Sequence, residues 1–192
     1  RAELGSAPHG PQPALAAPNL NVKLNCVPMG DNDSQLVPLA ALARDSRLSV
    51  RFIELMPIGL GSSLPRRTQA QVMEMLEQAF GPALPCSRAE GAGPGQYVTF
   101  QGFQGKVGFI SAMTHQFCGD CNRVRLTATG FLKTCLQYEA GVDLKALLDS
   151  GADDETVLRA MSDAIAHKPA AHHFTEGREA LDEKRNMNQI GG

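Results

Sequence analysis

Three cysteines in the second half of this 192-residue chain have a spacing that is typical of metal sites. Cys118 and Cys121 are separated by two residues, so a tight turn directs both thiolates toward one metal centre, and Gly119 is expected to ease that turn. Cys135 follows fourteen residues after Cys121. A cysteine pair of this kind with a third cysteine nearby usually binds metal inside cells, and the alternative is three unrelated buried thiols.

A hairpin is expected between the second and third of these cysteines. Thr127 and Phe131 flank a three-residue segment that ends in glycine, which is typical of a short hairpin loop. In that register Arg123 lies opposite Cys135, and Cys121 lies diagonally from it. The hairpin would therefore bring the third sulfur back to the first two.

The identity of the metal stays open on this pattern alone. Zinc prefers a closed tetrahedral site in structural roles, and His115 is available as the fourth ligand. Iron–sulfur clusters usually take four cysteines, so three cysteines on a [4Fe–4S] cluster would leave one iron open for an outside ligand. Cys26 and Cys86 stand apart from the three and are expected to be ordinary buried or loop thiols.

A basic strand follows directly after the second cysteine. The period of two puts Arg123 and Arg125 on the same face as Cys121, with Val124 and Leu126 on the other. Two guanidinium groups beside a metal centre favour a polyanion such as a triphosphate. The alternative is a pair of arginines on a solvated face.

The elements that must position these residues read as an α/β fold. A strand over residues 20–27, a helix over 34–43 and a strand over 48–55 predict a βαβ unit with two parallel strands. The sequence further predicts a helix at 68–80, an irregular Gly-rich stretch at 86–105, a strand at 106–112, and helices at 142–148 and 154–167. Two parallel strands need further strands, so more sequence is expected upstream.

Lys23 lies on the first of those strands, in line with Asn21 and Asn25. Parallel strands flanked by helices are normally apolar on both faces, so a polar line suggests the interior of a barrel near its active site. The alternative is an edge strand with a wet face.

The bulk composition is ordinary. The chain is 43% apolar and carries a net charge of −2, which gives no general indication of nucleic-acid or membrane binding. Residues 1–18 are rich in Ala, Pro and Gly and are expected to be a flexible linker or a cloning scar. They lack a signal core, and the chain begins at Arg1, so a cytoplasmic protein cropped from a longer one is expected.

The sequence resembles a known family, the GTP 3′,8-cyclases of molybdenum cofactor biosynthesis, which are radical S-adenosylmethionine enzymes. The resemblance covers roughly residues 19–192, the C-terminal part of such an enzyme. Five segments carry it, namely NVKLN at Asn21–Asn25, RFIELMPIG at Arg51–Gly59, FCGDCNRVRLTATGFLKTCL at Phe117–Leu136, KPAAHHF at Lys168–Phe174 and MNQIGG at Met187–Gly192.

The resemblance implies a fold and a division of the chain. The fold would be the terminal βα units of an incomplete TIM-like barrel, followed by a C-terminal iron–sulfur α+β region. Residues 19–62 would be the last barrel strands, and residues 63–192 a cluster- and GTP-binding domain that ends in a double-glycine tail.

The resemblance also implies site roles, each as an expectation. The three cysteines would hold a second [4Fe–4S] cluster whose open iron contacts the guanine of GTP. The remaining roles are GTP contacts by Lys23, Arg123, Val124 and Arg125, S-adenosylmethionine binding by Met56, and an active-site tail at Gly191 and Gly192. Lys168 and His172 fall in a matching segment without an assigned role. The partners would be GTP and the enzyme that forms the cyclic pyranopterin, and a homodimer is compatible with the family.

One departure from the family pattern limits these expectations. The C-x₃-C-x₂-C motif of the first cluster is missing, since Cys26 is the one cysteine before Cys86. The chain alone is therefore expected not to cleave S-adenosylmethionine. Two further functions stay open beside the lyase portion: a zinc-stabilised interaction module with His115 as ligand, and a non-catalytic GTP-binding remnant.

Overall fold

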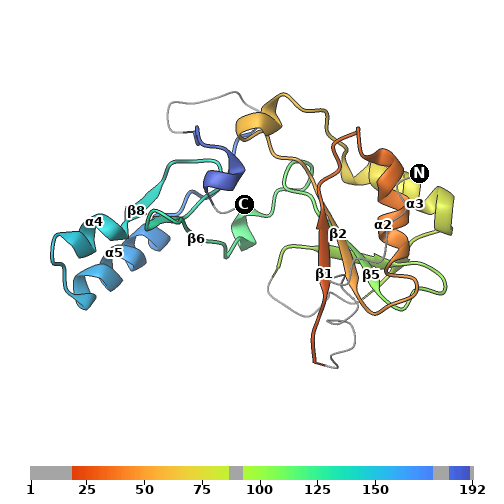
Figure 1. Cartoon of the computed structure of the whole chain (residues 1–192), viewed down its shortest axis with the longest axis horizontal. Helices are drawn as coiled ribbons and strands as arrows, with labels where there is room; N and C mark the ends of the chain where they lie inside the picture. Colours follow the sequence, from red (N-terminus) through yellow and green to blue (C-terminus); the bar gives the residue numbers. More distant parts are fainter. Residues whose placement is uncertain (1–18, 87–92, 175–181, 191–192) are drawn as a thin grey trace, which may run out of the picture. The chain divides into compact units, whose positions relative to one another are not determined.

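The computed structural model describes residues 19–86, 93–174 and 182–190, which fall into two compact units (Figure 1). Unit 1 contains the described residues up to Leu55 together with Pro65–Thr114. Unit 2 contains Met56–Leu64 and the described residues from His115 on. None of the helices in the described part of the chain combines the length and the apolarity that crossing a bilayer requires.

Unit 1 begins with the predicted βαβ unit. Strand β1 (Lys23–Cys26) is followed by helix α2 (Asp33–Ala41) and strand β2 (Ser49–Ile53), and the two strands pair in parallel with Lys23 opposite Ser49. Alternation on β1 confirms the expected two faces, because Val22, Leu24 and Cys26 pack against the core. Cys26 is thus a core thiol, as predicted.

The sheet of unit 1 continues beyond the βαβ unit. Helix α3 (Gln69–Phe80) leads to strands β3 (Leu84–Pro85), β4 (Gln96–Thr99) and β5 (Lys106–Ile110), and the strand order is β1-β2-β5-β4-β3. Strand β5 runs parallel to β2, whereas β4 and β3 are antiparallel.

The expectation of an irregular stretch over residues 86–105 was wrong for β4. Tyr97 pairs with Gly108 and Val98 pairs with Val107, so side chains of the segment alternate between the two faces of the sheet. Val98 packs against the core. The alternation is present in the sequence, but the surrounding glycines obscured it.

One apolar face of this sheet is covered by both helices of unit 1 (Figure 1). Leu36 and Ala40 of α2 and Val72 and Leu76 of α3 are fully or almost fully buried. They share one hydrophobic cluster with Val50, Phe52, Val107 and Phe109 of the central strands. Apolar residues recur every 3.6 positions on the helices and every two positions on the strands, so they lie on the faces that meet between the helices and the sheet.

Unit 2 is built from short elements around a three-stranded antiparallel sheet, in the order β6-β7-β8. The strands are β6 (Arg125–Leu126), β7 (Phe131–Lys133) and β8 (Gly141–Asp143), followed by helices α4 (Leu144–Asp149) and α5 (Asp154–Ala166). Three short 3₁₀ helices complete it, namely η1 (Gly59–Ser62), η2 (Cys118–Asp120) and η3 (Met187–Gln189).

The helix predicted at residues 142–148 begins later than expected. Val142 pairs with Leu132 in the sheet, and Asp143 caps α4 by accepting a hydrogen bond from the backbone N–H of Ala146 at 2.9 Å. A cap needs an extended backbone before the first turn, so the helix starts at Leu144. Asp153 caps α5 in the same way, by accepting a hydrogen bond from the Thr156 N–H at 2.9 Å.

The mixed α/β class predicted from the sequence is therefore confirmed, with a sheet that is part parallel and part antiparallel. The assignment to the end of a TIM-like barrel and to an iron–sulfur region stays a prediction, as does the division into residues 19–62 and 63–192. Residues 1–18, the expected linker, lie outside the described residues.

Candidate metal and nucleotide site

The two neighbouring cysteines of the predicted site lie on one tight turn. Cys118 begins η2, and Cys121 follows its last residue, with the Cys121 N–H bonded to the Cys118 carbonyl at 3.1 Å. Gly119 has an ordinary φ, and a Cβ there would meet no atom within 4 Å. The turn is the one predicted, but it does not require glycine at position 119.

The hairpin that returns toward these cysteines has the predicted register. Arg125 pairs with Lys133 and Leu126 with Leu132, and the loop closes with a hydrogen bond from the Thr127 N–H to the Phe131 carbonyl at 2.9 Å. Gly130 at the end of the loop has φ 82°, the left-handed conformation that favours glycine. Continued by two residues, the same register would set Arg123 opposite Cys135.

The strand itself is shorter than predicted, because the ladder starts at Arg125 rather than at Arg123. The preceding carbonyls of Cys121 and Arg123 accept hydrogen bonds from the ammonium group of Lys168, at 2.7 and 2.9 Å. The same ammonium lies 3.3 Å from the Cys121 sulfur. The Lys168 side chain therefore satisfies two backbone carbonyls that would pair with a neighbouring strand if β6 were longer.

Arg125 interacts electrostatically with two of the cysteines. Burial lowers the pKa of Arg125, the thiols of Cys121 and Cys135 act to raise it, and Arg123 lowers it further. The net pKa is below the usual value, as expected for a guanidinium withdrawn from water. Arg123, by contrast, is exposed.

The predicted alternation is visible in side-chain exposure from Val124 to Thr127, but not at Arg123, which is exposed although it was placed on the same face as Arg125. Leu126 is 63% exposed and Val124 is 43% exposed, whereas Thr127 is buried. Leu126 and Val124 therefore face outward. Arg125 and Thr127 are more withdrawn, on the side that carries the electrostatic contact with the cysteines.

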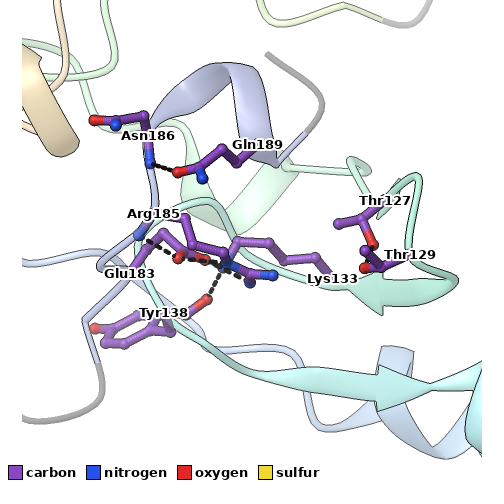
Figure 2. A network of polar contacts seen from close by, with 8 residues as sticks. All are labelled: Thr127, Thr129, Lys133, Tyr138, Glu183, Arg185, Asn186 and Gln189. Carbon is purple, nitrogen blue, oxygen red and sulfur yellow. Dashed lines mark hydrogen bonds and ion pairs between the residues drawn. The ribbon is translucent and has the colours of Figure 1, made fainter.

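A buried ion pair fixes the strand that leads to Cys135. The Lys133 ammonium lies 2.6 Å from the Glu183 carboxylate, both side chains are fully buried, and Lys133 also donates to the Tyr138 carbonyl (Figure 2). Arg185 donates to both oxygens of the same carboxylate at 2.9 Å, and it shares Oε2 with Lys133. The bonds from Arg185 and Lys133 outweigh burial and lower the pKa of Glu183 to about 2.

Glu183 and its neighbour Asp182 also tie the end of the described chain to the segment that follows the hairpin. The Glu183 N–H bonds the Gln137 carbonyl at 2.5 Å, and Gln137 in turn donates to Asp182 at 3.1 Å. A few residues later Ile190 is fully buried. Gly191 and Gly192, the predicted active-site tail, lie directly after this anchored segment but outside the described residues.

The predicted ligands are present as thiols but are not drawn together as a metal site. Cys118, Cys121 and Cys135 are free and half-buried. Among the described residues, no three Cys, His, Asp or Glu side chains are gathered closely enough to hold a metal ion, which applies to His115 as well. The assignment of the three cysteines as ligands therefore stays a prediction.

The donor chemistry nevertheless fits an anionic iron–sulfur cluster. The candidate ligands are three soft sulfur atoms, which suit iron–sulfur and zinc centres. Two cations lie near them: Lys168 donates to the Cys121 sulfur, and Arg125 is close enough for the charges of Cys121 and Cys135 to oppose the lowering of its pKa by burial. Positive side chains beside the sulfurs would offset the negative charge of a thiolate-bound cluster.

Two other predicted site residues lie elsewhere in the fold. Lys23 is half-buried at the start of β1 in unit 1, on the polar face where Asn25 accepts a 2.8 Å bond from Arg51. Met56 is half-buried in unit 2, and its carbonyl accepts a bond from the Ile58 N–H at 2.8 Å. Their roles stay predictions.

Lys133, Glu183 and Lys168 are the residues at this site for which sequence reasoning found no role. Each acts on a partner 45 to 50 positions away in the chain, so no local period or spacing signals it. Lys168 was noticed as part of a matching segment. Nothing within that segment indicates which residues the Lys168 side chain contacts.

Comparison with known proteins places this region in context. Residues 48–174 match the family model described as Molybdenum Cofactor Synthesis C. That span includes η2, the hairpin, Cys135 and Lys168. Lys23, the Glu183 segment and the two C-terminal glycines lie outside it.

Curated relatives give a consistent result. A GTP 3′,8-cyclase of Pelotomaculum thermopropionicum is 42% identical over 193 residues, covering 98% of this chain and 58% of that relative. One from Moorella thermoacetica is 38% identical over 194 residues, covering 100% of the chain and 59% of the relative. GTP 3′,8-cyclase 2 of Pseudomonas aeruginosa is 38% identical, covering 95% and 56%. The chain thus spans somewhat more than half the length of these relatives.

Proposed function

Since the chain belongs to the Molybdenum Cofactor Synthesis C family, we propose that it is the C-terminal part of a GTP 3′,8-cyclase, a lyase of molybdenum cofactor synthesis. The named relatives and the order of the matching segments support this. The proposal also keeps the expected fold, the end of a radical S-adenosylmethionine barrel followed by an iron–sulfur region.

Cys118, Cys121 and Cys135 would hold the second [4Fe–4S] cluster of that enzyme. When bound, the cluster would supply an open iron that contacts the guanine of GTP. Arg125 and Lys168 would balance the negative charge of the thiolates, and the buried Lys133–Glu183 pair would hold the strand that ends next to Cys135.

GTP would be bound by Arg123, Val124 and Arg125 beside the cysteines, with the two guanidinium groups on the phosphates. Arg123 is exposed and so able to meet a charged ligand, whereas Arg125 is already partly withdrawn from water. Lys23 would be a further GTP contact.

The remaining roles concern the complete enzyme. Met56 would help to bind S-adenosylmethionine, and Gly191 and Gly192 would reach the active site. In that enzyme a bond forms between the ribose of GTP and C8 of guanine, and the product passes to the enzyme that forms the cyclic pyranopterin. A cytoplasmic location and a homodimer belong to the same proposal.

One observation carries the proposal furthest. The turn with Cys118 and Cys121, the hairpin register and Arg125 in electrostatic contact with two cysteines all fall inside the family match. A polyanion and a sulfur-bound metal are the two ligands that this combination suits.

Metal analysis after anaerobic reconstitution with iron and sulfide tests the cluster. We expect about four irons per chain, following the composition of a [4Fe–4S] cluster, and a large loss of iron in Cys135→Ser. Cys86→Ser is the matched control, because Cys86 lies in unit 1 outside the three. Stoichiometric zinc that falls in His115→Ala would instead support the zinc-stabilised module.

Equilibrium binding of GTP to the reconstituted chain tests the nucleotide site. We expect binding to weaken strongly in the double variant Arg123→Ala, Arg125→Ala and to weaken less in Lys23→Ala. Arg159→Ala, on the exposed surface of α5, is the control and should bind as the parent does. No binding by the reconstituted parent would contradict the GTP site.

The chain alone is expected to form no 5′-deoxyadenosine from S-adenosylmethionine, because its sequence has no C-x₃-C-x₂-C motif. GTP binding without turnover would then mark it as the substrate-positioning part of the enzyme. Formation of 5′-deoxyadenosine by this chain would refute that division of labour.

A further inference from the structure

Lys168 lies two residues after the last residue of α5, and its ammonium has three acceptors within hydrogen-bond reach. The acceptors are the carbonyls of Cys121 and Arg123, at 2.7 and 2.9 Å, and the Cys121 sulfur, at 3.3 Å. A lysine ammonium has three donors and no acceptor, so this set uses its full capacity. The residue is half-buried, which limits competition from water.

The place of Lys168 in the chain is itself fixed. Its backbone N–H bonds the Ile165 carbonyl at 3.2 Å in the last turn of α5, and Pro169 follows. Proline cannot continue a helix, so the chain turns away there and the lysine side chain is held at the helix end. The C-terminal end of a helix also favours a positive charge.

The segment that receives these bonds lacks regular structure of its own. Residues 121–124 lie between η2 and β6, and the sheet ladder begins at Arg125. The two carbonyls bonded by Lys168 flank Asn122, so one side chain fixes the path of the backbone through the site. The same contact sets the position of the Cys121 sulfur relative to Arg123.

From these contacts we propose that Lys168 is a positioning residue of the metal site, which holds Cys121 in place and donates a charged hydrogen bond to its sulfur when the cluster is bound. The proposal rests on the proposed function, since it needs the cluster on these cysteines.

Two measurable consequences follow from that role. A charged donor at a ligand sulfur withdraws electron density and favours the more negative, reduced state of the cluster, so it raises the reduction potential. A partner that orients a ligand also slows metal loss, and removing such partners typically weakens metal binding by about 10- to 100-fold.

The test uses the reconstituted 192-residue chain and four single variants of it. Lys168→Met keeps an unbranched side chain one atom shorter and removes the donors and the charge. Lys168→Gln keeps donors without charge, and Lys168→Arg keeps both. Lys145→Met is the matched control, because Lys145 is an exposed lysine of unit 2 that pairs with Asp149 on α4. Circular dichroism first establishes that each variant is folded.

Redox titration, the electron paramagnetic resonance spectrum and iron loss to a chelator are then compared with the parent. We expect Lys168→Met and Lys168→Gln to have lower midpoint potentials and altered spectra. In Lys168→Met iron loss should be about 10- to 100-fold faster. Lys168→Arg should recover most of the parental potential, and Lys145→Met should match the parent.

A purely structural role for Lys168 predicts a different pattern, in which stability changes but the potential and spectrum of the loaded cluster do not. That result in either folded neutral variant would overturn the proposal while the proposed function stands. A parent chain that binds no cluster would overturn both, and the two failures are therefore distinguishable.

Discussion

The two units of the chain bury different kinds of side chain. In unit 1 the buried cluster joins helices and sheet through apolar residues, among them Leu36, Val50 and Phe109. In unit 2 the buried set includes Lys133, Glu183 and other polar residues, beside a few apolar ones such as Leu132 and Ile190. Helix α5 has no buried residue along its whole length.

This difference suits the different tasks of the two units. Apolar burial stabilises strongly but is not directional, so it builds a scaffold without fixing a single polar geometry. Buried charged hydrogen bonds fix geometry, although they contribute little net stability because both partners lose their hydration. We infer that unit 2 relies on its polar contacts to define the hairpin and the cysteine turn.

The largest expected effect comes from breaking the buried pair of unit 2. Glu183→Gln keeps the shape of the side chain but leaves the Lys133 ammonium buried beside a neutral amide. Removing one partner of a buried ion pair typically destabilises by about 3–5 kcal/mol. Hydrogen exchange should speed up in β6, β7 and β8 while β2 and β5 of unit 1 stay protected.

Glu155→Gln is the matched control for that experiment. Glu155 also pairs with an arginine, Arg159, but both side chains are largely exposed on α5. Surface pairs contribute little, so exchange should be unchanged. Equal effects of the two glutamate variants would contradict the role assigned to the buried pair.

A substitution that creates a cavity tests how much the apolar core stabilises unit 1. Leu76 on α3 is fully buried, and Leu76→Ala should destabilise unit 1 by about 2–5 kcal/mol. Leu158 on α5 is 62% exposed, so Leu158→Ala should have little effect. Urea unfolding measures both, and a large effect at Leu158 would show that α5 is packed in solution.

Acid should weaken the polar contact at Glu183. Its folded pKa of about 2 lies below the ordinary value of 4.5, so the charged form stabilises the fold above pH 4.5. This contribution is lost as the pH falls from 4.5 toward 2, and the shift corresponds to at most about 3 kcal/mol. The fall in stability from pH 5 to pH 2 should be smaller in Glu183→Gln.

Unit 1 offers a comparison for this pH dependence. Burial acts to raise the pKa of Glu54, but hydrogen bonds from Thr114, Gln69 and Met113 outweigh it, so the pKa is lowered. Glu54→Gln should therefore also reduce the acid dependence, but the change in hydrogen exchange should lie in unit 1. An identical pattern in both variants would show that the two units unfold together.

The two units also differ in how far the sequence predicted them. Local periodicity located α2, α3 and the parallel pair β1 and β2, because each buries an apolar face. The register of the hairpin followed from its loop, since Gly130 takes the left-handed conformation that the loop requires. Both successes rest on signals carried by neighbouring residues.

The polar contacts of unit 2 could not be found in this way. A lysine in a strand or after a helix is normally exposed, and nothing local marks Lys133 or Lys168 as paired. Their partners are brought close by the fold alone. The same reason explains why β6 was predicted too long, since Lys168 occupies the carbonyls of Cys121 and Arg123.

The smallest expected effects are at helix caps, where the two units can be compared at matched positions. Thr68 caps α3 in a reciprocal pair with Gln71, and Thr68→Ala should destabilise unit 1 by about 1 kcal/mol.

Asp153 caps α5 through the Thr156 N–H at 2.9 Å, but α5 has no buried residue to hold its first turn if the cap is lost. In Asp153→Ala, hydrogen exchange should therefore rise in the first turn of α5 alone, whereas Thr68→Ala should raise it throughout unit 1. A change confined to the first turn of α3 in Thr68→Ala would mean that its apolar face does not couple the cap to the core, against the contrast drawn between the units.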